Sequence, residues 1–528
     1  MIPAKKRNLK PFPIFAIIFI TSLILSIFFV QKEEAVGAKK IRLLWTNDTH
    51  GYLKPLYHKD YYDEDYESLA KKEGKIGGFA HIATLVNKLR NEMPDTTFLF
   101  DAGDTWHGTG VPLLEEGKSV VKIMNEMKYD AMAPGNVEFL FPKKVFLARV
   151  ADSKFPVLAL NLSDLEMDEL VLKPYVVIDR GGYKLGIMGM AYQWTAKTGE
   201  RSLTEGWSFG LREKEAANFA KELREKHKVD LVILLSHMGK GPDLKFASRV
   251  NGIDVILGAH THDLMDPASE VKNPEGKTVI VTQAGSHGKN LGRLDVYIKD
   301  GKIAKYDHQI YRIIAKEIKP DPKIQKIIDE EYAKYKWMEE IIGSTKTMLY
   351  RRAIWQSTMD NFITDTYRRI ENADVAFSPA WRFGATIMPG DITVDDVYNM
   401  VPTLDHIFSV ELDGESIKMA LEQSFDNVIA EDPYLQLGGD MIRFSGIEIR
   451  YNTKKPLGER IKILKINGKP FDPAKTYKVV SAAGQIQNHP NGVNKKDTGK
   501  VAVETLVDYI KKNSPISSRV DDRIKEDK

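Results

Sequence analysis

Five short segments of the sequence combine carboxylate, amide and imidazole side chains, and each follows a run of apolar residues. The segments are Asn47-Asp48-Thr49-His50, Asp101-Ala102-Gly103-Asp104, Gly135-Asn136-Val137-Glu138, Ser236-His237 and His260-Thr261-His262. Such side chains bind divalent ions such as Mn, Fe or Zn. A carboxylate shared between two ions places them ~3.5–4 Å apart, where they activate a water molecule and clamp the group that is cleaved. The sequence therefore predicts a two-metal hydrolytic centre.

Two of the segments can each offer two ligands to one site. Residues two apart on an extended chain point to the same side, so Asp48 pairs with His50 and His260 pairs with His262. Taken alone, an Asp-x-His or a Gly-Asp is more often turn chemistry, and His237 could be a buried histidine of the core. The five segments together, each at a strand end, favour one shared site.

The apolar runs predict the elements that position these side chains. Runs at 41–45, 98–100, 157–160, 185–189, 231–235 and 255–257 have the length and composition of strands buried on both faces. Amphipathic stretches between them predict helices. We therefore expect an α/β (α+β) fold, a layered β-sandwich flanked by helices, with the strand ends facing one cleft.

The remainder of the chain predicts a second, smaller domain. Residues 316–342 are rich in Lys, Glu, Ile and Tyr, with Pro320 and Pro322 near the start, which is typical of a helical linker. A strand-rich region with a hairpin signal at Asn467-Gly468 follows later. We expect a metal-binding domain at 39–315, a linker helix at 316–342 and an α/β substrate domain at 343–528.

The N-terminus has the pattern of an export signal. A basic stretch from Lys5 to Lys10 precedes an apolar run from Phe12 to Val30, and Val36-Gly37-Ala38 offers a small-residue cleavage site. The run is long for a signal and nearly long enough to span a bilayer, so residues 1–38 are either a cleaved signal or a membrane anchor. Both alternatives place the body of the protein outside the cytoplasm.

Composition excludes several classes of function. The formal net charge is +3, and because residues 1–38 hold five positive and two negative side chains, the rest is close to neutral. This balance gives no electrostatic case for nucleic-acid binding. The chain has no cysteine, which excludes disulfides, thiolate metal sites and a cysteine nucleophile.

The five segments, in this order, resemble the signature of the calcineurin-like metallophosphoesterase and 5'-nucleotidase superfamily: Asp-x-His, Gly-Asp, Gly-Asn-His-Glu, His and Gly-His-x-His. The resemblance implies that Asp48, His50 and His262 hold one metal and that Asn136, His237 and His260 hold the other. Asp104 would bridge the two ions, and Asp101 would orient the loop that carries it.

Further segments resemble the SoxB thiosulfohydrolases, namely 101–106, 258–263, 284–289, 349–352, 378–384 and 432–441. This resemblance implies a periplasmic enzyme with two manganese ions that acts on a SoxYZ-like sulfur-carrier protein. Thiosulfate sulfur would be attached to a cysteine on the carrier's C-terminal arm, and hydrolysis would release sulfate and leave a persulfide. We expect a monomer that binds no nucleic acid.

Position 137 departs from the superfamily pattern. The superfamily has a histidine there that stabilises the transition state or protonates the leaving oxygen, whereas this chain has Val137 after the retained Asn136. General acids contribute about 10²–10⁴-fold, so either the substrate needs no acid, or another residue supplies it, or catalysis is lost. SoxB also lacks this histidine and carries a tryptophan, and a sulfur leaving group departs as an anion without prior protonation. His107 is the nearest substitute in sequence, but we expect it to be an exposed loop histidine.

The second domain should supply the substrate contacts. Arg382 is the first candidate for binding a sulfonate, because a guanidinium suits oxyanions, and we expect it to act in catalysis with Asp104 and His237. The further substrate-binding candidates are Arg351, Arg352, Gln436, Asp440 and Arg443. For the three arginines, surface ion pairing is the alternative. We expect Trp381 and Phe383 to be core aromatics rather than walls of a channel.

Two other functions remain open. A 5'-nucleotidase or related phosphoesterase would release phosphate and would place aromatic rings to stack a base. A non-catalytic protein would keep the metals only for stability. Val137 opposes the first alternative, and the complete set of ligands opposes the second.

Overall fold

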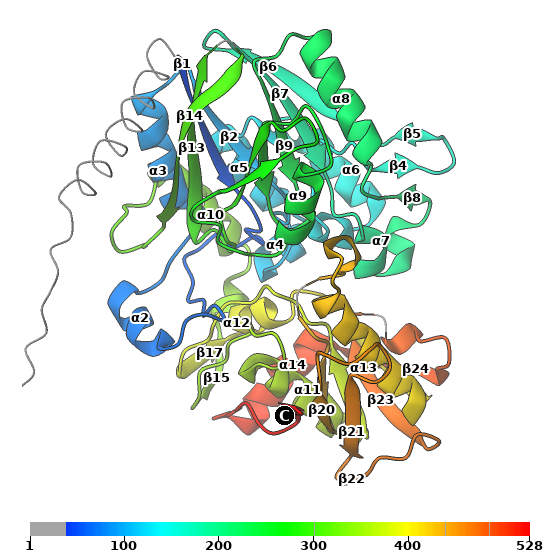
Figure 1. Ribbon diagram of the computed structural model, residues 1–528. Helices are drawn as coiled ribbons and strands as arrows, with labels where there is room; N and C mark the ends of the chain where they lie inside the picture. The colour runs from blue at the N-terminus through cyan, green and yellow to red at the C-terminus, as the bar shows by residue number, and fades with distance from the viewer. Residues whose placement is uncertain (1–38, 300, 439, 485, 528) are drawn as a thin grey trace, which may run out of the picture.

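The computed structural model describes residues 39–299, 301–438, 440–484 and 486–527. The chain forms an N-terminal part, from β1 to β14, that lies above a C-terminal part in Figure 1. The predicted export segment at residues 1–38 lies outside the described residues. From residue 39 onward, no described helix is both long and apolar enough to cross a membrane.

The N-terminal part contains two large sheets. The five-stranded sheet has the order β14-β13-β1-β2-β3, with β1 (Lys39–Thr46), β2 (Thr97–Asp101), β3 (Ala131–Met132), β13 (Asn290–Lys299) and β14 (Lys302–Arg312). The six-stranded sheet has the order β11-β12-β10-β9-β7-β6, with β6 (Tyr175–Arg180), β7 (Tyr183–Met190), β9 (Leu231–Ser236), β10 (Val255–Gly258), β11 (Ser269–Lys272) and β12 (Thr278–Gln283). Strands that precede predicted ligands pair in parallel with one another, β1 with β2 and β9 with β10.

The two sheets pack face to face because their strands are apolar on both faces. Leu43 and Trp45 of β1 join Ile187 of β7 and Ile233 of β9 in one buried cluster between the sheets. Leu44, which points to the opposite face of β1, belongs instead to the cluster under the helices. Burying such a side chain contributes about 1.5–3 kcal/mol, so both faces stabilise the sandwich.

Helices cover the outer faces of the sandwich. On the first sheet lie α3 (Phe79–Glu92) and α5 (Lys118–Met127), with α4 (Gly110–Leu114) and α6 (Lys143–Asp152) beside them, and on the second lie α8 (Glu213–Glu225) and α9 (Lys240–Ala247). Shorter elements complete this part: α2 (Tyr66–Glu73), α7 (Thr195–Thr198), the 3-10 turns η1 (Val137–Leu140) and η2 (Arg201–Thr204), and a small sheet of β4 (Ser163–Asp164), β5 (Glu169–Leu170) and β8 (Trp207–Ser208). The predicted helix-flanked sandwich is confirmed.

The chain passes to the C-terminal part through α10 (Pro322–Ala333) and η3 (Lys336–Glu339). Asp321 caps α10 by accepting from the backbone N–H groups of Lys323 and Ile324, and Pro322 occupies its first turn. The helix packs on α3 and α5 of the N-terminal part. It therefore lies within the stretch 316–342 that the sequence assigned to a linker.

The C-terminal part is built on two smaller sheets. One has the order β19-β16-β23-β18-β24, with β16 (Val375–Ser378), β18 (His406–Asp413), β19 (Arg443–Ser445), β23 (Thr476–Ala482) and β24 (Val493–Val501). The other has the order β22-β21-β20-β25, with β20 (Ile447–Tyr451), β21 (Ile461–Ile466), β22 (Lys469–Pro470) and β25 (Ile524–Glu526). Asn467 and Gly468, both with positive φ, form the two-residue turn between β21 and β22, so the predicted hairpin is confirmed.

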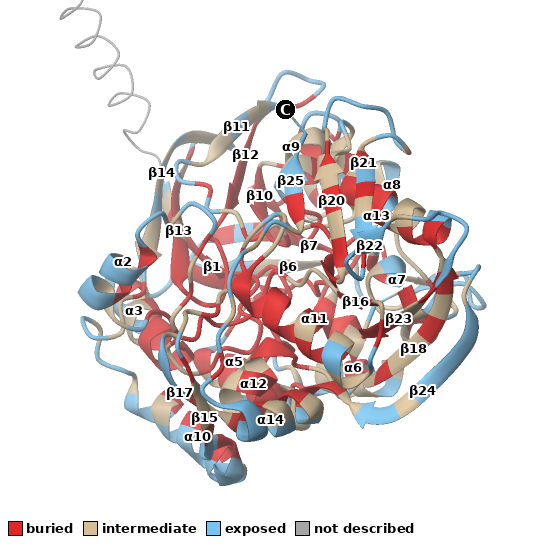
Figure 2. Cartoon of the chain, turned by 90° about the horizontal axis from the view of Figure 1, so that it is seen from below, coloured by how far each residue is buried: buried red, intermediate tan, exposed pale blue. Residues whose placement is uncertain are grey.

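Helices join the two parts into one buried core. The C-terminal helices are α11 (Thr358–Ile370), α12 (Val394–Met400), α13 (Gly414–Ile429) and α14 (Ala502–Asn513), with the turns η4 (Pro433–Leu435) and η5 (Ile486–Asn488) and the strand pair β15 (Ile341–Thr345) and β17 (Gly390–Thr393). One hydrophobic cluster runs from α3 and α5 to α11 and α14. Figure 2 shows buried residues concentrated along this interior, whereas β24 at the sheet edge is largely exposed.

Candidate metal centre

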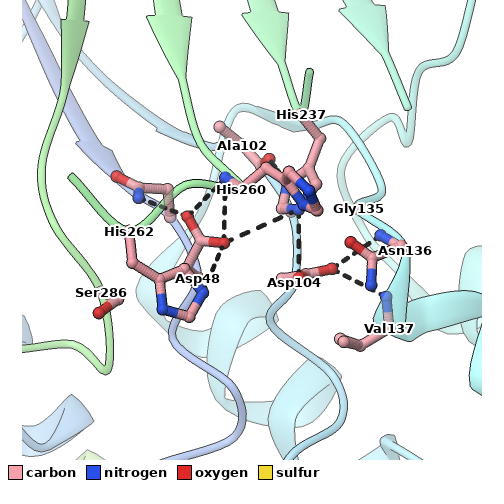
Figure 3. A network of polar contacts seen from close by, with 12 residues as sticks. Asp48, Ala102, Asp104, Gly135, Asn136, Val137, His237, His260, His262 and Ser286 are labelled. Atoms are coloured by element: carbon pink, nitrogen blue, oxygen red, sulfur yellow. Dashed lines mark hydrogen bonds and ion pairs between the residues drawn. The ribbon is translucent and has the colours of Figure 1, made fainter. Parts of the chain in front are cut away.

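The predicted ligands follow strands of both sheets and meet at one edge of the sandwich. Figure 3 shows Asp48, Asp104, Asn136, His237, His260 and His262 together at this place. Asp48 and His50 follow β1, and Asp104 follows β2, while His260 and His262 follow β10. Because parallel strands end at the same edge, residues far apart in the chain arrive together. Asn136 reaches the site after β3, and His237 follows β9 directly.

The acidic and imidazole ligands form two overlapping groups. The first contains Asp48, His50, Asp104 and His262, and the second contains Asp104, His237 and His260. In each group the ligand atoms lie within 4.8 Å of one another, and every member is buried. Asp104 belongs to both groups, the position that the superfamily resemblance gives to a bridging carboxylate.

The contact distances suit ligands that share cations. His50 Nε2 lies 3.0 Å from His262 Nε2, a spacing at which two imidazoles converge on one point. Asp48 Oδ1 lies 3.3 Å from His262 Nε2 and 3.7 Å from His237 Nε2. His237 Nε2 lies 3.2 Å from Asp104 Oδ2, so the second group closes on the same carboxylate.

Several polar atoms of this cluster are buried without a hydrogen-bond partner. Asn136 Oδ1, His237 Nε2 and both ring nitrogens of His260 are in this state. Buried polar atoms in proteins are otherwise nearly always hydrogen-bonded, so unpaired ones that converge indicate a bound group. Nitrogen and oxygen donors of these types suit divalent cations, and the residues present fit two of them.

The ligands sit in left-handed backbone conformations rather than on extended chain. The φ angles are +49° at Asp48, +47° at His50, +56° at Asp104, +74° at His260 and +61° at His262. The explanation that residues two apart on an extended chain share a side is therefore wrong for these pairs. Tight turns aim the side chains instead, and such conformations cost about 1–3 kcal/mol each, which the surrounding structure must offset.

Two glycines allow the loops after β2 and β3 to touch. A Cβ atom on Gly103 would lie 2.3 Å from the backbone nitrogen of Gly135, and one on Gly135 would lie 2.1 Å from Asp104 Oδ1. The backbone N–H groups of Asn136 and Val137 donate to that same Oδ1 at 2.7 and 2.8 Å. Asp104 Oδ2 is thereby left to face the histidines.

Two further carboxylates hold the loop that carries Asp104. Asp101 Oδ1 accepts from the backbone of Gly103 and the hydroxyl of Thr105, as the sequence led us to expect of a residue that orients the loop. Glu138 accepts from the backbone N–H groups of Asp104, Thr105, Trp106 and Gly135. Burial raises the pKa of Asp101 to about 7 and raises that of Glu138 as well. Glu138 was not predicted as a site residue, although it is the last member of the third motif.

A second buried polar cluster adjoins the first ligand group and was not predicted. Lys289 Nζ lies 2.5 Å from Asp60 Oδ2 and 3.1 Å from His58 Nδ1. The His58 ring lies 4.0 Å from the ring of His287, which in turn lies 5.5 Å from the ring of His262. The segment 284–289 signalled two of these residues, but nothing near His58 and Asp60 in sequence pointed to the metal centre.

The C-terminal part reaches the metal loops through two arginines. Arg382 donates from Nη2 to the carbonyl of His260, and Arg352 donates from Nη2 to the carbonyl of Thr261 at 3.1 Å. Both side chains are buried, and Arg382 Nε has no hydrogen-bond partner. These two of the predicted substrate-binding residues therefore lie against the loop that supplies His260 and His262.

The other predicted substrate-binding residues have partners within the C-terminal part or at its boundary. Arg351 Nη1 lies 2.5 Å from Asp360 Oδ1, and Arg443 Nε lies 3.1 Å from Asp360 Oδ2. Asp440 pairs with Arg443 at 3.0 Å and with Arg352 at 3.5 Å. The alternative of surface ion pairing is wrong for these arginines, because they are buried. The backbone carbonyl of Gln436 accepts from the hydroxyl of Tyr192, and its side-chain amide donates to Ala430.

The predictions for two aromatic side chains and one histidine have different outcomes. Trp381 is half-buried and packs against the large hydrophobic cluster, as predicted for a core aromatic. Phe383 is buried as predicted, and it also stacks on the ring of His50 with the ring centroids 4.5 Å apart, so it forms part of the wall of the site as well. His107 was expected to be an exposed loop histidine, but it is only 2% exposed, so that prediction is wrong.

Metal binding should release more protons at pH 6 than at pH 8.5. Burial raises the pKa of Asp48 to about 7, and, against the effect of burial, the charges of Asp104 and Asp48 raise that of His237 to about 10. In the metal-free protein at pH 6 both groups hold a proton, whereas at pH 8.5 only His237 does. Because ligands bind metals in their deprotonated forms, metal binding should release one more proton per protein at pH 6 than at pH 8.5. Calorimetry of Mn²⁺ binding in buffers of different ionisation enthalpy measures it, and equal release at both pH values would contradict the assignment of Asp48.

Comparisons with known protein families divide the chain in two. Residues 41–264 match the family described as calcineurin-like phosphoesterase, and residues 341–495 match the 5'-nucleotidase, C-terminal domain. The first match contains the metal ligands of both groups. The second contains the arginines that reach them.

Individual proteins resemble the chain over most of its length. The trifunctional nucleotide phosphoesterase protein YfkN of Bacillus subtilis is 28% identical over 93% of this chain, which spans only 35% of that protein. The solved structure of the sulfate thiohydrolase SoxB of Thermus thermophilus is 26% identical, covers 92% of this chain and 96% of its own, and has a TM-score of 0.86. A solved 5'-nucleotidase precursor, also of Thermus thermophilus, is 26% identical as well, covers 92% of this chain and 99% of its own, and has a TM-score of 0.81.

Proposed function

We propose that this chain, whose two parts match the calcineurin-like phosphoesterase family and the 5'-nucleotidase C-terminal domain, is a dimanganese thiosulfohydrolase. Its substrate is a cysteine S-thiosulfonate on the C-terminal arm of a SoxYZ-like sulfur-carrier protein, and its product is sulfate. The likeness to SoxB in fold and sequence supports this proposal. The coarser assignment, a metal-dependent hydrolase, is common to the relatives named above.

The observation that carries the proposal is Val137. Its backbone donates to Asp104 Oδ1, so the residue lies directly beside the carboxylate that both ligand groups share (Figure 3). Its side chain has no polar atom to give a proton to a leaving alkoxide, for which a general acid is worth about 10²–10⁴-fold. A persulfide departs as an anion, so its hydrolysis does not suffer from the exchange of histidine for valine.

The arginines of the C-terminal domain suit a sulfonate. Arg382 is buried beside His260 with an unpartnered Nε, and a buried guanidinium binds planar or tetrahedral oxyanions strongly. Arg352 donates to the carbonyl of Thr261, the residue that follows His260 on the same loop. Phe383, stacked on His50, helps to exclude bulk water from the place where the sulfonate would lie.

Asp48, His50, Asp104 and His262 would hold one manganese ion, and Asp104, Asn136, His237 and His260 would hold the other. When bound, the two ions supply an activated water molecule and positive charge opposite the sulfonate oxygens. Asp101 and Glu138 keep the Asp104 loop in place, and Arg382 orients the sulfonate. We further propose an exported, periplasmic protein, in agreement with the export pattern at residues 1–38 and with the word precursor in the name of one solved relative.

A 5'-nucleotidase is the second candidate, favoured by the retained Asn136 and by the names of YfkN and of the second solved relative. The packing of the aromatic rings at the site argues against a 5'-nucleotidase. Tyr192 stacks on His260 at 3.8 Å and Phe383 stacks on His50 at 4.5 Å, so ligand imidazoles already occupy faces that a base would need. A non-catalytic binding protein is the third candidate, but the complete set of metal ligands opposes it.

The mature protein loaded with Mn²⁺ should release sulfate from a carrier peptide that bears a cysteine S-thiosulfonate, and should release no phosphate from AMP. His50→Ala should abolish sulfate release, because it removes a ligand whose Nε2 lies 3.0 Å from that of His262. Ion chromatography measures both anions. Arg382→Met should raise KM for the thiosulfonate, whereas Arg450→Met, which changes an arginine of β20, should not.

Phosphate without sulfate would make the protein a nucleotidase and overturn the proposal. Neither product from a protein that holds both metals, measured by elemental analysis, would favour the binding role.

A further inference from the structure

His107 is a buried histidine that the metal centre does not use. Its Nδ1 atom is buried without a hydrogen-bond partner. Buried imidazole nitrogens in native folds are nearly always hydrogen-bonded, so one without a protein partner is free to bond to a bound molecule.

The loop that carries His107 is held rigidly against the ligands. Glu138 accepts from the backbone of Thr105 and Trp106, immediately before His107. Immediately after it, Gly108 passes so close to His50 that a Cβ atom at Gly108 would lie 2.6 Å from the Cβ of His50. His107 therefore lies between a backbone segment held by Glu138 and a glycine packed against the ligand His50.

His107 also approaches the segment that contains Val137. The rings of His107 and Phe141 pack in a T-shaped arrangement with their centroids 5.0 Å apart. Phe141 directly follows the turn η1, which begins at Val137. Burial lowers the pKa of His107 to about 4, with Asp104 acting in the opposite direction. At neutral pH the ring is therefore uncharged and carries one N–H group that can donate a hydrogen bond.

We propose that His107 donates a hydrogen bond to the departing atom of the bound substrate, a contact that Val137 cannot make. The inference rests on the hydrolytic function proposed above and deepens it. During hydrolysis the water oxygen bonds to the sulfonate sulfur while the sulfur–sulfur bond breaks. The electron pair of that bond goes to the persulfide sulfur, and the protons of the water pass to solvent. The imidazole keeps its own proton, and its N–H dipole stabilises the negative charge that develops on the departing sulfur.

The other polar groups of the site lie where they could bind the other end of the substrate. Arg382 and Arg352 donate to the carbonyls of His260 and Thr261, on the loop after β10. His107 and Val137 come from the loops after β2 and β3, in the other sheet. Donors from the C-terminal domain thus suit the sulfonate, and a donor from the loop after β2 suits the opposite end of the bond that breaks.

His107→Phe should lower kcat by about 10²-fold with KM nearly unchanged, the effect typical of losing one donor to a developing anion. Phenylalanine preserves the packing on Phe141 but has no N–H. His107→Gln, which retains a donor, should keep more activity than His107→Phe. The double variant His107→Phe with Val137→His should recover at least about tenfold over His107→Phe, because the new imidazole adjoins the same carboxylate.

The dependence on the leaving group separates this contact from a purely structural role. Kinetics are measured on two series, S-sulfonated thiols and aryl phosphates, in which the acidity of the leaving group varies. The loss in His107→Phe should be greatest for the least acidic leaving groups. Calorimetry should also show that His107→Phe binds thiosulfate more weakly than the wild type does, because the outer sulfur of thiosulfate takes the place of the departing atom. Metal content and Tm confirm that the variant is loaded and folded.

An equal loss for all leaving groups, or no loss, would overturn the role of His107. If only the aryl phosphates are hydrolysed, the thiosulfonate function fails, yet the phosphate series still decides whether His107 contacts the departing atom. Hydrolysis of neither series by the manganese-loaded wild type would overturn both proposals.

Discussion

Asp104→Asn should remove bound metal and lower kcat/KM by at least about 10³-fold, the scale of losing a central electrostatic contact in a catalytic site. Asp104 is the one residue common to both ligand groups, with Oδ2 3.2 Å from His237 Nε2 and 3.9 Å from His50 Nε2. Asparagine is neutral, and its amide would turn either a weaker oxygen or an N–H group toward a cation. Elemental analysis of the purified variant and initial rates measure the two effects.

Asp101→Asn provides the matched control, because Asp101 lies on the same loop and is equally buried but belongs to neither ligand group. Its oxygens accept from Thr46, Gly103 and Thr105, so the substitution weakens only the support of the loop. Changes to such supporting residues typically cost about 10–100-fold in metal affinity or activity. If Asp101→Asn were as damaging as Asp104→Asn, or if Asp104→Asn retained both metals, the bridging role would be refuted.

The layered sandwich could be predicted because the information is local to each strand. The run at 41–45 is apolar at every position but one, and β1 is buried on both faces by the second sheet and by α3 and α5. Parallel strands end at the same edge of a sheet, so residues that follow them lie close together. The convergence of Asp48, Asp104 and His260 therefore follows from where the apolar runs end. The turn at Asn467-Gly468 was predictable for a similar reason, since its residue types favour positive φ.

The backbone conformation of the ligands could not be predicted in this way. Asp48, His50 and His262 adopt positive φ angles that non-glycine residues disfavour, and only the packed structure maintains them. The Gly103–Gly135 contact shows why, because it forces the loops after β2 and β3 together and leaves little choice of backbone path. Local sequence preference is weaker than this tertiary constraint.

The burial of His107 was missed because its neighbours come from elsewhere in the chain. Residue types around it are typical of a loop, and loops are commonly exposed. Phe141, which packs against the ring, and Glu138, which holds the backbone of the two preceding residues, lie more than thirty positions away. The same cause applies to Arg443 of β19, because its partner Asp360 lies far away in the sequence, on α11.

Asp360→Ala should lower the free energy of unfolding by about 3–5 kcal/mol, the cost of leaving buried charges unpaired. Asp360 is the carboxylate partner of two buried guanidiniums, at 2.5 Å from Arg351 and 3.1 Å from Arg443. It also accepts from the hydroxyl of Ser357 at 2.6 Å, at the start of α11. Urea denaturation followed by tryptophan fluorescence measures the change.

Asp179→Ala is the matched control, because the Asp179 side chain is 64% exposed and lies 3.9 Å from Lys184. Exposed pairs of this kind contribute at most about 1 kcal/mol, so stability should barely change. Combining Asp360→Ala with Arg351→Met and Arg443→Met should recover part of the lost stability, since no guanidinium is then left without Asp360, and Asp440, which loses Arg443, keeps Arg352 at 3.5 Å. If Asp360→Ala were no more destabilising than Asp179→Ala, Asp360 would not neutralise the arginines, and both guanidiniums would again be available to bind a substrate oxyanion.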